Sequence, residues 1–399
     1  MPEEHTERPL LRDRNLLIIF GVTLMVIMGV SSIMPVLPEM GRVFGASPAS
    51  IALVVTLFTL PGIVLTPVAG VLADRYGRKV ILVPALLIFS VFGSACAFAD
   101  DFHTLLLLRL FQGIGVAPLG VLNVTLVGDL FAGPERAKAM GYAASVLSIG
   151  TAAFPALGGL LAMFDWQYPF LLPALAAPLA LVVALRLDEP PRGRRESFMD
   201  YIRSTARILK SRRAIGLFAI CLMTFIILYG CFITYLPMLL RMEGDASPLA
   251  IGLIVSTASA LTALAASQSG RLAQRFSPPG LMRAAFVCYA VSLALVPVVP
   301  GLWWRILPVT LFGLAQGLNI PNLMNMLTHL APTSKRAAVM AVNGTVLRVG
   351  QTVGPLLMGA VFAGLGAAPV FFAGVLFAGA MIVVLQVFVV PTQTQGDAK

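Results

Sequence analysis

The sequence predicts an all-α integral membrane protein with twelve transmembrane helices, arranged as two pseudo-symmetric six-helix halves. Of its 399 residues, 58% are hydrophobic and 12% are charged, whereas soluble globular domains carry about 25% charged residues. The charges gather between apolar runs of about 20 residues, the length that crosses a bilayer. The chain also repeats itself, and such a repeat reveals architecture.

The internal repeat has a shift of 200 residues. Ala-Ser-Pro at 46–48 recurs at 246–248, and the Gly-and-Pro pattern of 150–159 recurs at 350–359. Parallel repeats of six helices are typical of transporters whose substrate site lies between the halves, near the middle of the bilayer.

The apolar runs divide the chain into three parts. The N-terminal half, 1–187, is predicted to hold helices at about 15–38, 51–71, 80–99, 103–129, 138–162 and 168–187. A cytoplasmic linker follows at 188–213, with an amphipathic helix from Phe198 to Leu209. The C-terminal half, 214–399, is predicted to hold helices at about 214–240, 249–271, 282–300, 304–330, 337–363 and 367–390.

The net charge of +10 reports membrane topology and not nucleic-acid binding. Of the 28 Lys and Arg residues, 23 fall in segments on one side, against three on the other (Arg42, Arg241 and Arg305). By the positive-inside rule both termini lie in the cytoplasm. We expect a multi-pass protein of the plasma membrane, or of the inner membrane in a bacterium.

The sequence offers no catalytic or metal-binding constellation. The four cysteines all fall in apolar runs without metal-ligand spacing. There is no H-E-x-x-H, G-x-S-x-G or P-loop pattern. We therefore predict no enzyme activity, no metal and no cofactor.

The loop between the second and third predicted helices carries the most specific motif. Residues 70–79 contain Gly70, Asp74, Arg75, Gly77 and Arg78 in the pattern G-x-L-x-D-R-x-G-R-K. This pattern resembles the signature loop of the major facilitator superfamily, and the resemblance extends over nearly the whole chain. Within that superfamily the chain is most similar to the 12-helix drug/proton antiporters.

The fourth predicted helix contains Arg109, Gln112 and Gly113. This resembles the R-x-x-Q-G motif of the superfamily, in which the arginine is associated with substrate or proton coupling. The resemblance therefore implies that Arg109 and Gln112 line the substrate cavity. The alternative is an arginine satisfied by carbonyl groups and used only for packing.

The fifth and eleventh predicted helices carry glycine patterns that resemble the antiporter motif of the superfamily, although Phe154 stands where the family has glycine. Small residues at four-residue spacing allow helices to approach closely, and proline supplies a bend. We expect a hinge and packing seam at the following residues: Gly150, Pro155, Gly158, Gly159, Gly350, Gly354 and Pro355.

Asp129 and Arg136 resemble the D-x-x-x-x-x-x-R element that follows the fourth helix in many superfamily members. There the aspartate pairs with an arginine of the signature loop when the cytoplasmic side is closed. The resemblance implies a cytoplasmic gate made of Gly70, Asp74, Arg75, Gly77, Arg78, Asp129 and Arg136. Such a gate supplies a bistable element for alternating access.

Arg348 is the most informative residue inside the membrane. It lies twelve residues past Arg336, roughly 18 Å along a helix and near the midplane. No carboxylate is predicted there. An intramembrane arginine costs about 2.5–3.5 kcal/mol on insertion scales and normally faces a wet cavity or the bundle interior. With it we place in the cavity Thr345, Thr352, Gln316, Asn319, Asn322, Asn325 and Tyr229.

We therefore predict a secondary transporter that works by alternating access and exports small amphipathic compounds in exchange for protons. A second hypothesis is a carrier of an organic anion or metabolite that uses Arg348 and Arg109. A third is a membrane sensor that transports nothing. The expected partners are a small-molecule substrate, protons and the lipid bilayer, without nucleic acid, and the expected state is a monomer.

Overall fold

A computed structural model describes residues 10–189, 210–330 and 336–390 of the chain, and within them the regular structure is helical. Twelve helical stretches of these residues are long and apolar enough to cross a membrane. The amphipathic helix predicted at 198–209 lies outside the described residues.

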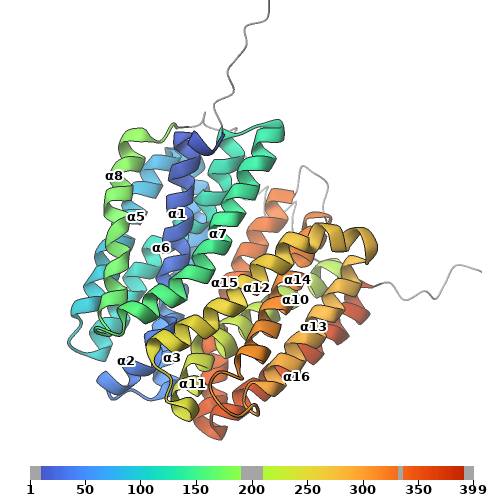
Figure 1. Ribbon diagram of the computed structural model, residues 1–399. Helices are drawn as coiled ribbons and strands as arrows, with labels where there is room; N and C mark the ends of the chain where they lie inside the picture. The colour runs from blue at the N-terminus through green and yellow to red at the C-terminus, as the bar shows by residue number, and fades with distance from the viewer. Residues whose placement is uncertain (1–9, 190–209, 331–335, 391–399) are drawn as a thin grey trace, which may run out of the picture.

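The first bundle precedes the linker (Figure 1). Asp13 and Asp101 cap α1 and α6 by accepting hydrogen bonds from the backbone N–H groups of Leu16 and Thr104. The helices are η1 (Leu10–Arg12), α1 (Arg14–Ser31), η2 (Met34–Val36), α2 (Leu37–Val43), α3 (Pro48–Thr59), α4 (Pro61–Tyr76), α5 (Arg78–Ala95), η3 (Cys96–Phe98), α6 (Phe102–Leu130), α7 (Gly133–Leu161), η4 (Tyr168–Leu175) and α8 (Ala176–Arg186).

The second bundle follows the linker and repeats the local structure of the first. Ser47 caps α3, and Ser247, its equivalent in the repeat, caps α12 with the same geometry, each followed by proline. The helices are α10 (Arg212–Ile226), the π-helix η5 (Ile227–Tyr235), α11 (Leu236–Gly244), α12 (Pro248–Arg275), α13 (Pro278–Leu295), α14 (Ile306–Thr328), α15 (Arg336–Leu365), α16 (Ala367–Val384) and the π-helix η7 (Leu385–Val389).

Several predicted membrane helices are interrupted. The first is broken between Ser31 and Leu37, beside Pro35 and Pro38, and the sixth begins with the 3₁₀ segment η4. Proline lacks the N–H that would continue the α-helical hydrogen-bond pattern. The seventh passes through the π-helix η5, in which the Thr234 hydroxyl donates to the Tyr229 carbonyl at 2.7 Å. Such π segments are frequent at functional sites.

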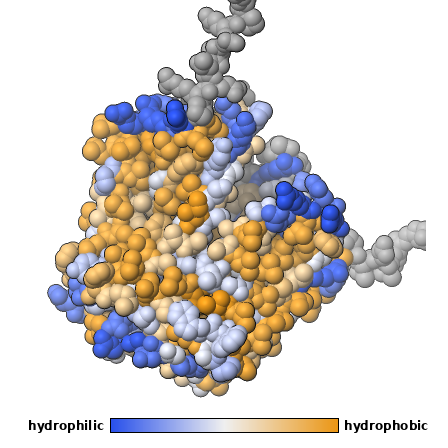
Figure 2. Space-filling view, in the orientation of Figure 1, coloured by the Kyte–Doolittle hydropathy of each residue, from blue (hydrophilic) through white to orange (hydrophobic). Residues whose placement is uncertain are grey.

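The outer surface is suited to a bilayer. Figure 2 shows a broad apolar band across the visible face of both bundles, with hydrophilic side chains gathered at the two ends. We call the end at which α1 and α10 begin and α8 ends the terminal face, and the end that carries α2 and α11 the opposite face. In Figure 1 the terminal face is at the top.

The two bundles converge toward the opposite face and separate toward the terminal face (Figure 1). Helix α7 of the first bundle packs along α12 of the second, and α15 packs along α3 and α4. These helices line the space between the bundles, where the functional site is to be sought.

Candidate functional site

Helices α7 and α12 are in backbone contact near the opposite face. A Cβ atom on Gly159 would lie 2.4 Å from the Pro248 carbonyl oxygen, and one on Gly252 would lie 2.2 Å from that of Pro155. Real Cβ atoms do not come so close to backbone oxygen. Glycine is therefore required at both positions, and no passage remains between the helices there.

A second contact closes the same side between α3 and α15. The Thr59 and Thr352 hydroxyls lie 3.0 Å apart, and Thr56 donates to the Thr352 carbonyl at 3.4 Å. Nearer the opposite face, the Tyr235 hydroxyl donates to the Pro48 carbonyl at 3.4 Å. These bonds join the two bundles, and we call them, together with the α7–α12 contact, the opposite-face seal.

The same helices are apart at the terminal face. Cβ atoms added to Gly70, Gly141, Gly270 or Gly344, which lie on α4, α7, α12 and α15, would meet nothing within 4 Å. Figure 2 shows the corresponding hollow between the bundles at the top. Among the described residues a central cavity between the bundles therefore opens at the terminal face, and the opposite-face seal closes its other end. Gly70, one of the predicted gate residues, makes no close backbone contact in this conformation.

Arg348 lies at the inner end of this cavity. Its side chain is partly buried, and its Nη1 donates to Gln351 Oε1 at 3.0 Å. It extends from α15 toward the first bundle, where Gly62 of α4 and Gly120 of α6 leave room for it. Tyr229 of η5 is also partly buried, and η5 packs against α15. The structure thus places the predicted residues Arg348 and Tyr229 on adjacent helices.

Arg109, in contrast, does not reach the cavity, and its predicted place there is corrected. It is fully buried inside the first bundle, where it donates to the Val54 and Gly29 carbonyls at 3.2 and 3.1 Å. Its guanidinium lies 4.1 Å from the centre of the Phe58 ring. Its third acceptor, Gln112 Oε1 at 2.6 Å, is equally buried. The hydrogen bonds of this pair go to protein groups, which agrees with the packing alternative, although Arg109 Nη2 and Gln112 Nε2 are buried without a partner among the described residues.

The amides of α14 also face away from the cavity. Gln316 accepts a hydrogen bond from the Tyr289 hydroxyl, and Asn319 donates to Thr224 at 2.9 Å. Asn322 bonds to its own helix, and all three amides are buried. These residues connect α10, α13 and α14 within the second bundle, so their predicted cavity role is corrected. Asn325 alone is exposed, near the terminal end of α14.

The two threonines predicted around Arg348 differ in their surroundings. Thr352 is buried in the opposite-face seal, one turn beyond Arg348, and is not open to the cavity. Thr345 is partly buried, one turn toward the terminal face, and its hydroxyl donates to the Ala341 carbonyl of its own helix. Only Thr345 keeps the predicted place beside the open space.

The glycines predicted as a packing seam lie in close contacts. A Cβ on Gly158 would lie 1.8 Å from the Ser32 carbonyl oxygen, and one on Gly354 would lie 2.8 Å from that of Ile226. A Cβ on Gly150 would lie 3.0 Å from the Leu24 side chain, and one on Gly350 would lie 2.8 Å from the Leu222 carbonyl oxygen. Pro155 and Pro355 lie inside α7 and α15. Hinge motion at these residues is a separate matter and stays a prediction.

Three of the predicted gate residues, Asp74, Arg78 and Asp129, form an ion cluster within the first bundle. Arg78 pairs with Asp74 at 2.6 Å and with Asp129 at 2.9 Å. Gly77, with φ of 108°, turns the chain between α4 and α5. The pairs exist while the terminal face is open, so the expected dependence of the Asp129 pair on closure is corrected. Among the described residues no ion pair joins the bundles.

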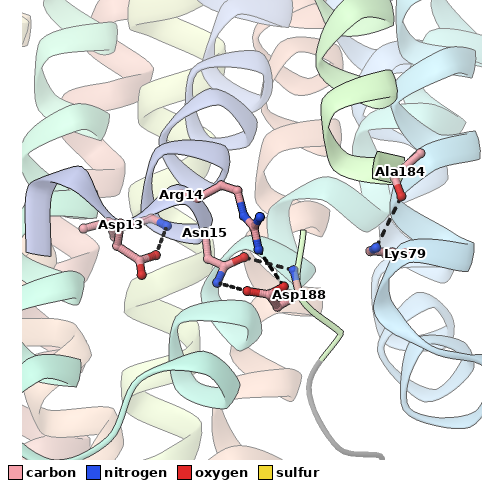
Figure 3. A network of polar contacts seen from close by, with 7 residues as sticks. Asp13, Arg14, Asn15, Lys79, Ala184 and Asp188 are labelled. Carbon is pink, nitrogen blue, oxygen red and sulfur yellow. Dashed lines mark hydrogen bonds and ion pairs between the residues drawn. The ribbon is translucent and has the colours of Figure 1, made fainter. Parts of the chain in front are cut away.

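The other two gate arginines make no such pair in the described structure. Arg75 lies over the Tyr76 ring at 5.4 Å, and Arg136 lies beside Gly128. A second polar network holds the terminal end of the first bundle (Figure 3): Arg14 and Asn15 donate to the Asp188 carboxylate at 2.7 and 2.9 Å. These hydrogen bonds hold the Asp188 pKa below its usual value of 3.8.

The architecture and the central cavity can now be compared with known proteins. A family model described as the Major Facilitator Superfamily matches residues 19–245 and 239–399. The chain belongs to the Major Facilitator Superfamily. It is therefore a membrane transporter and not an enzyme.

Relatives within the Major Facilitator Superfamily include exporters. The chain is 23% identical to the quinolone resistance protein NorA of Staphylococcus aureus (strain MRSA252), over 94% of this chain and 97% of that protein. It is 34% identical to the bacillibactin exporter of Bacillus subtilis (strain 168), over 39% of this chain and 41% of that protein. A bacterial homologue of the lysosomal transporter Spinster, crystallised in an inward-facing and occupied conformation, has the same fold: the TM-score is 0.75 at 18% identity, over 94% of both chains.

Three residues that border Arg348 were absent from the sequence prediction: Gln351, Gly62 and Gly120. Gln351 follows Arg348 by three residues, so helical spacing on the same face could have indicated it. The two glycines belong to α4 and α6, more than 200 residues away along the chain. No local signal connects them with Arg348.

Proposed function

We propose that this protein exports small amphipathic compounds by alternating access, driven by the proton gradient. The observation that carries the proposal is a central cavity that is open at the terminal face and closed by the opposite-face seal. A conformation closed on one side is one of the two states that alternating access requires. Both sides of the cavity come from one chain, so the functional unit is a monomer of two halves joined at 188–213.

The direction of transport follows from which face lies in the cytoplasm. The described terminal face carries many cations, whereas the opposite face carries Arg42, Arg241 and Arg305, and each of these pairs with a nearby carboxylate. The positive-inside rule assigns the terminal face to the cytoplasm. The cavity then loads from the cytoplasm and releases outside, in the plasma membrane or the inner membrane of a bacterium. The names of the relatives, a resistance protein and an exporter, support export.

Topology is tested by labelling single cysteines in intact cells with a membrane-impermeant maleimide. Cysteine at Met242, which is exposed on α11, should react, and cysteine at Lys138 of α7 should react only after the cells are permeabilised. The described native cysteines are buried or partly buried, which keeps the background low. The reverse pattern would place the terminal face outside and overturn export.

Transport itself is tested in proteoliposomes loaded with acidic buffer. The probes are naphthalene-2-sulfonate and 2-naphthyltrimethylammonium, which share a ring system and carry fixed opposite charges. Accumulation of either probe above protein-free liposomes, abolished when the pH gradient is collapsed, is the expected result. Accumulation that does not depend on the pH gradient would contradict proton coupling but would still support transport. Binding without any transport would instead favour a sensor.

A further inference from the structure

Arg348 occupies a slot formed by the other bundle. A Cβ on Gly62 would lie 2.9 Å from Arg348 Cδ and 3.1 Å from its Nε, and one on Gly120 would lie 3.1 Å from its Nη2. Any larger residue at either position would displace the side chain. The charge therefore sits between α4 and α6 of the first bundle and α15 of the second, where the cavity narrows to the seal.

The Arg348 charge has no carboxylate partner among the described residues. Its side-chain hydrogen bond goes to the neutral amide of Gln351, and none of the ion pairs includes it. Nor is it enclosed by carbonyl groups as Arg109 is. A guanidinium is a fork of donors that matches a carboxylate, sulfonate or phosphate. Here part of that fork remains open to the cavity.

Two neighbours complete the surroundings of Arg348. Tyr229 lies on the π-helix η5, which packs against α15, and its partly exposed side chain carries a hydroxyl that can donate a hydrogen bond. Gln351 is buried and accepts the hydrogen bond of Arg348, which holds the guanidinium in place. One turn further, Thr352 is already buried in the seal. A compound that enters from the terminal face thus meets Arg348 one turn before the closed end.

We propose that Arg348, positioned by Gln351 and assisted by Tyr229 of the adjacent π-helix η5, binds the anionic group of the transported compound, so that the preferred substrates are amphipathic anions. This inference rests on the proposed transport function and names its substrate class. It also suggests why loading favours closure. Closing the terminal side of an empty cavity strips water from an unpaired guanidinium, which is costly. A bound anion offsets that cost, so the loaded protein closes more readily than the empty one.

The test compares the two naphthyl probes by calorimetric titration of the purified protein in detergent and by uptake into proteoliposomes. Wild type should bind naphthalene-2-sulfonate more tightly than 2-naphthyltrimethylammonium. Arg348→Gln should weaken binding of the sulfonate about tenfold or more, the equivalent of one charge-assisted hydrogen bond. Arg271→Gln, which removes an exposed arginine of α12, is the matched control and should bind as wild type.

Arg348→Lys and Gly62→Ala keep the test decisive if Arg348→Gln does not fold. The lysine keeps the charge and should retain part of the sulfonate affinity. Gly62→Ala should reduce that affinity, whereas Gly141→Ala, in open space on α7, should not. If wild type transports the ammonium probe and ignores the sulfonate, or if Arg348→Gln binds the sulfonate normally, the anion inference fails and export stands. If wild type neither binds nor transports either probe, the proposed export function fails as well.

Discussion

Two arginines inside the membrane differ because of their neighbours. Arg109 has two carbonyls, an amide and an aromatic ring around it and is fully buried. Arg348 has one neutral amide and an open side. Both are arginines within membrane-spanning helices, and the surrounding acceptors separate the structural arginine from the candidate ligand-binding one.

Arg109→Gln should destabilise the protein without changing its selectivity. Loss of the guanidinium removes its hydrogen bonds to the Gly29 and Val54 carbonyls, and a buried hydrogen bond from a charged group contributes about 1.5–3 kcal/mol. We expect a melting temperature several degrees lower in detergent, with the sulfonate-to-ammonium binding ratio unchanged. Arg271→Gln again serves as the control. If Arg109→Gln instead changed the sulfonate-to-ammonium binding ratio without lowering the melting temperature, Arg109 would belong to the substrate site.

Asp188 should make a small contribution to stability that depends on pH. Its pKa is lowered by the hydrogen bonds from Asn15 and Arg14, so the stabilisation is present above its ordinary pKa of 3.8 and is lost as the pH falls through the folded-state value. The melting temperature of wild type should exceed that of Asp188→Asn by about 1–2 °C at neutral pH. The difference should shrink below pH 3.8. A difference that grows with acid would contradict this assignment.

At the scale of elements, glycine position along a helix decides whether two helices touch. Gly252 and Gly270 lie on the same helix, α12, yet one faces the Pro155 carbonyl and the other faces open space. Glycine is required at position 252 because the helices are in contact there. At position 270 it contributes only the flexibility that glycine brings to a helix.

Gly252→Ala should open the opposite-face seal, and Gly270→Ala should not. The added Cβ would lie 2.2 Å from backbone oxygen, which forces α7 and α12 apart. We expect a lower melting temperature and faster maleimide labelling of a cysteine introduced at Tyr235, which is buried in the seal. Gly270→Ala should be neutral or stabilising by up to about 1 kcal/mol, because alanine favours the helix. Equal effects at the two positions would refute the contact argument.

At the scale of the whole molecule, the two faces should move in opposite senses. Spin labels at Lys138 and Arg271 report the terminal face, and labels at Val43 and Met242 report the opposite face. When a transported probe is added, the distance distribution of the first pair should gain a shorter population and that of the second a longer one. Distances that stay constant at both faces during transport would contradict alternating access by the two bundles.

Much of the architecture was predictable because its causes are local. Runs of about 20 apolar residues specify a membrane helix by themselves. Ser47 and Ser247 cap helices through contacts three residues away. The interruptions were harder, since the π segment around Tyr229 has no proline at its centre to announce it. The linker boundaries at 188–213 and its amphipathic helix stay predictions.

The candidate site was predictable only in part, because its members come from distant segments. Helical spacing correctly placed Arg348 and Thr345 on one helix, but it placed Thr352 and the α14 amides in the same cavity, where packing instead buries them. A periodic pattern says which residues share a face of a helix. It does not say which neighbouring helix covers that face.

The sequence by itself determined the membrane class, the helix count, the repeat and the family, since hydrophobic length, capping and motif spacing act within short stretches. The tertiary structure alone decided which face is closed, which arginine is enclosed, and which glycines touch. Those outcomes depend on contacts such as Gly252 with Pro155 and Arg348 with Gly120. They join residues far apart in the chain, and such contacts exist only once the two bundles have packed.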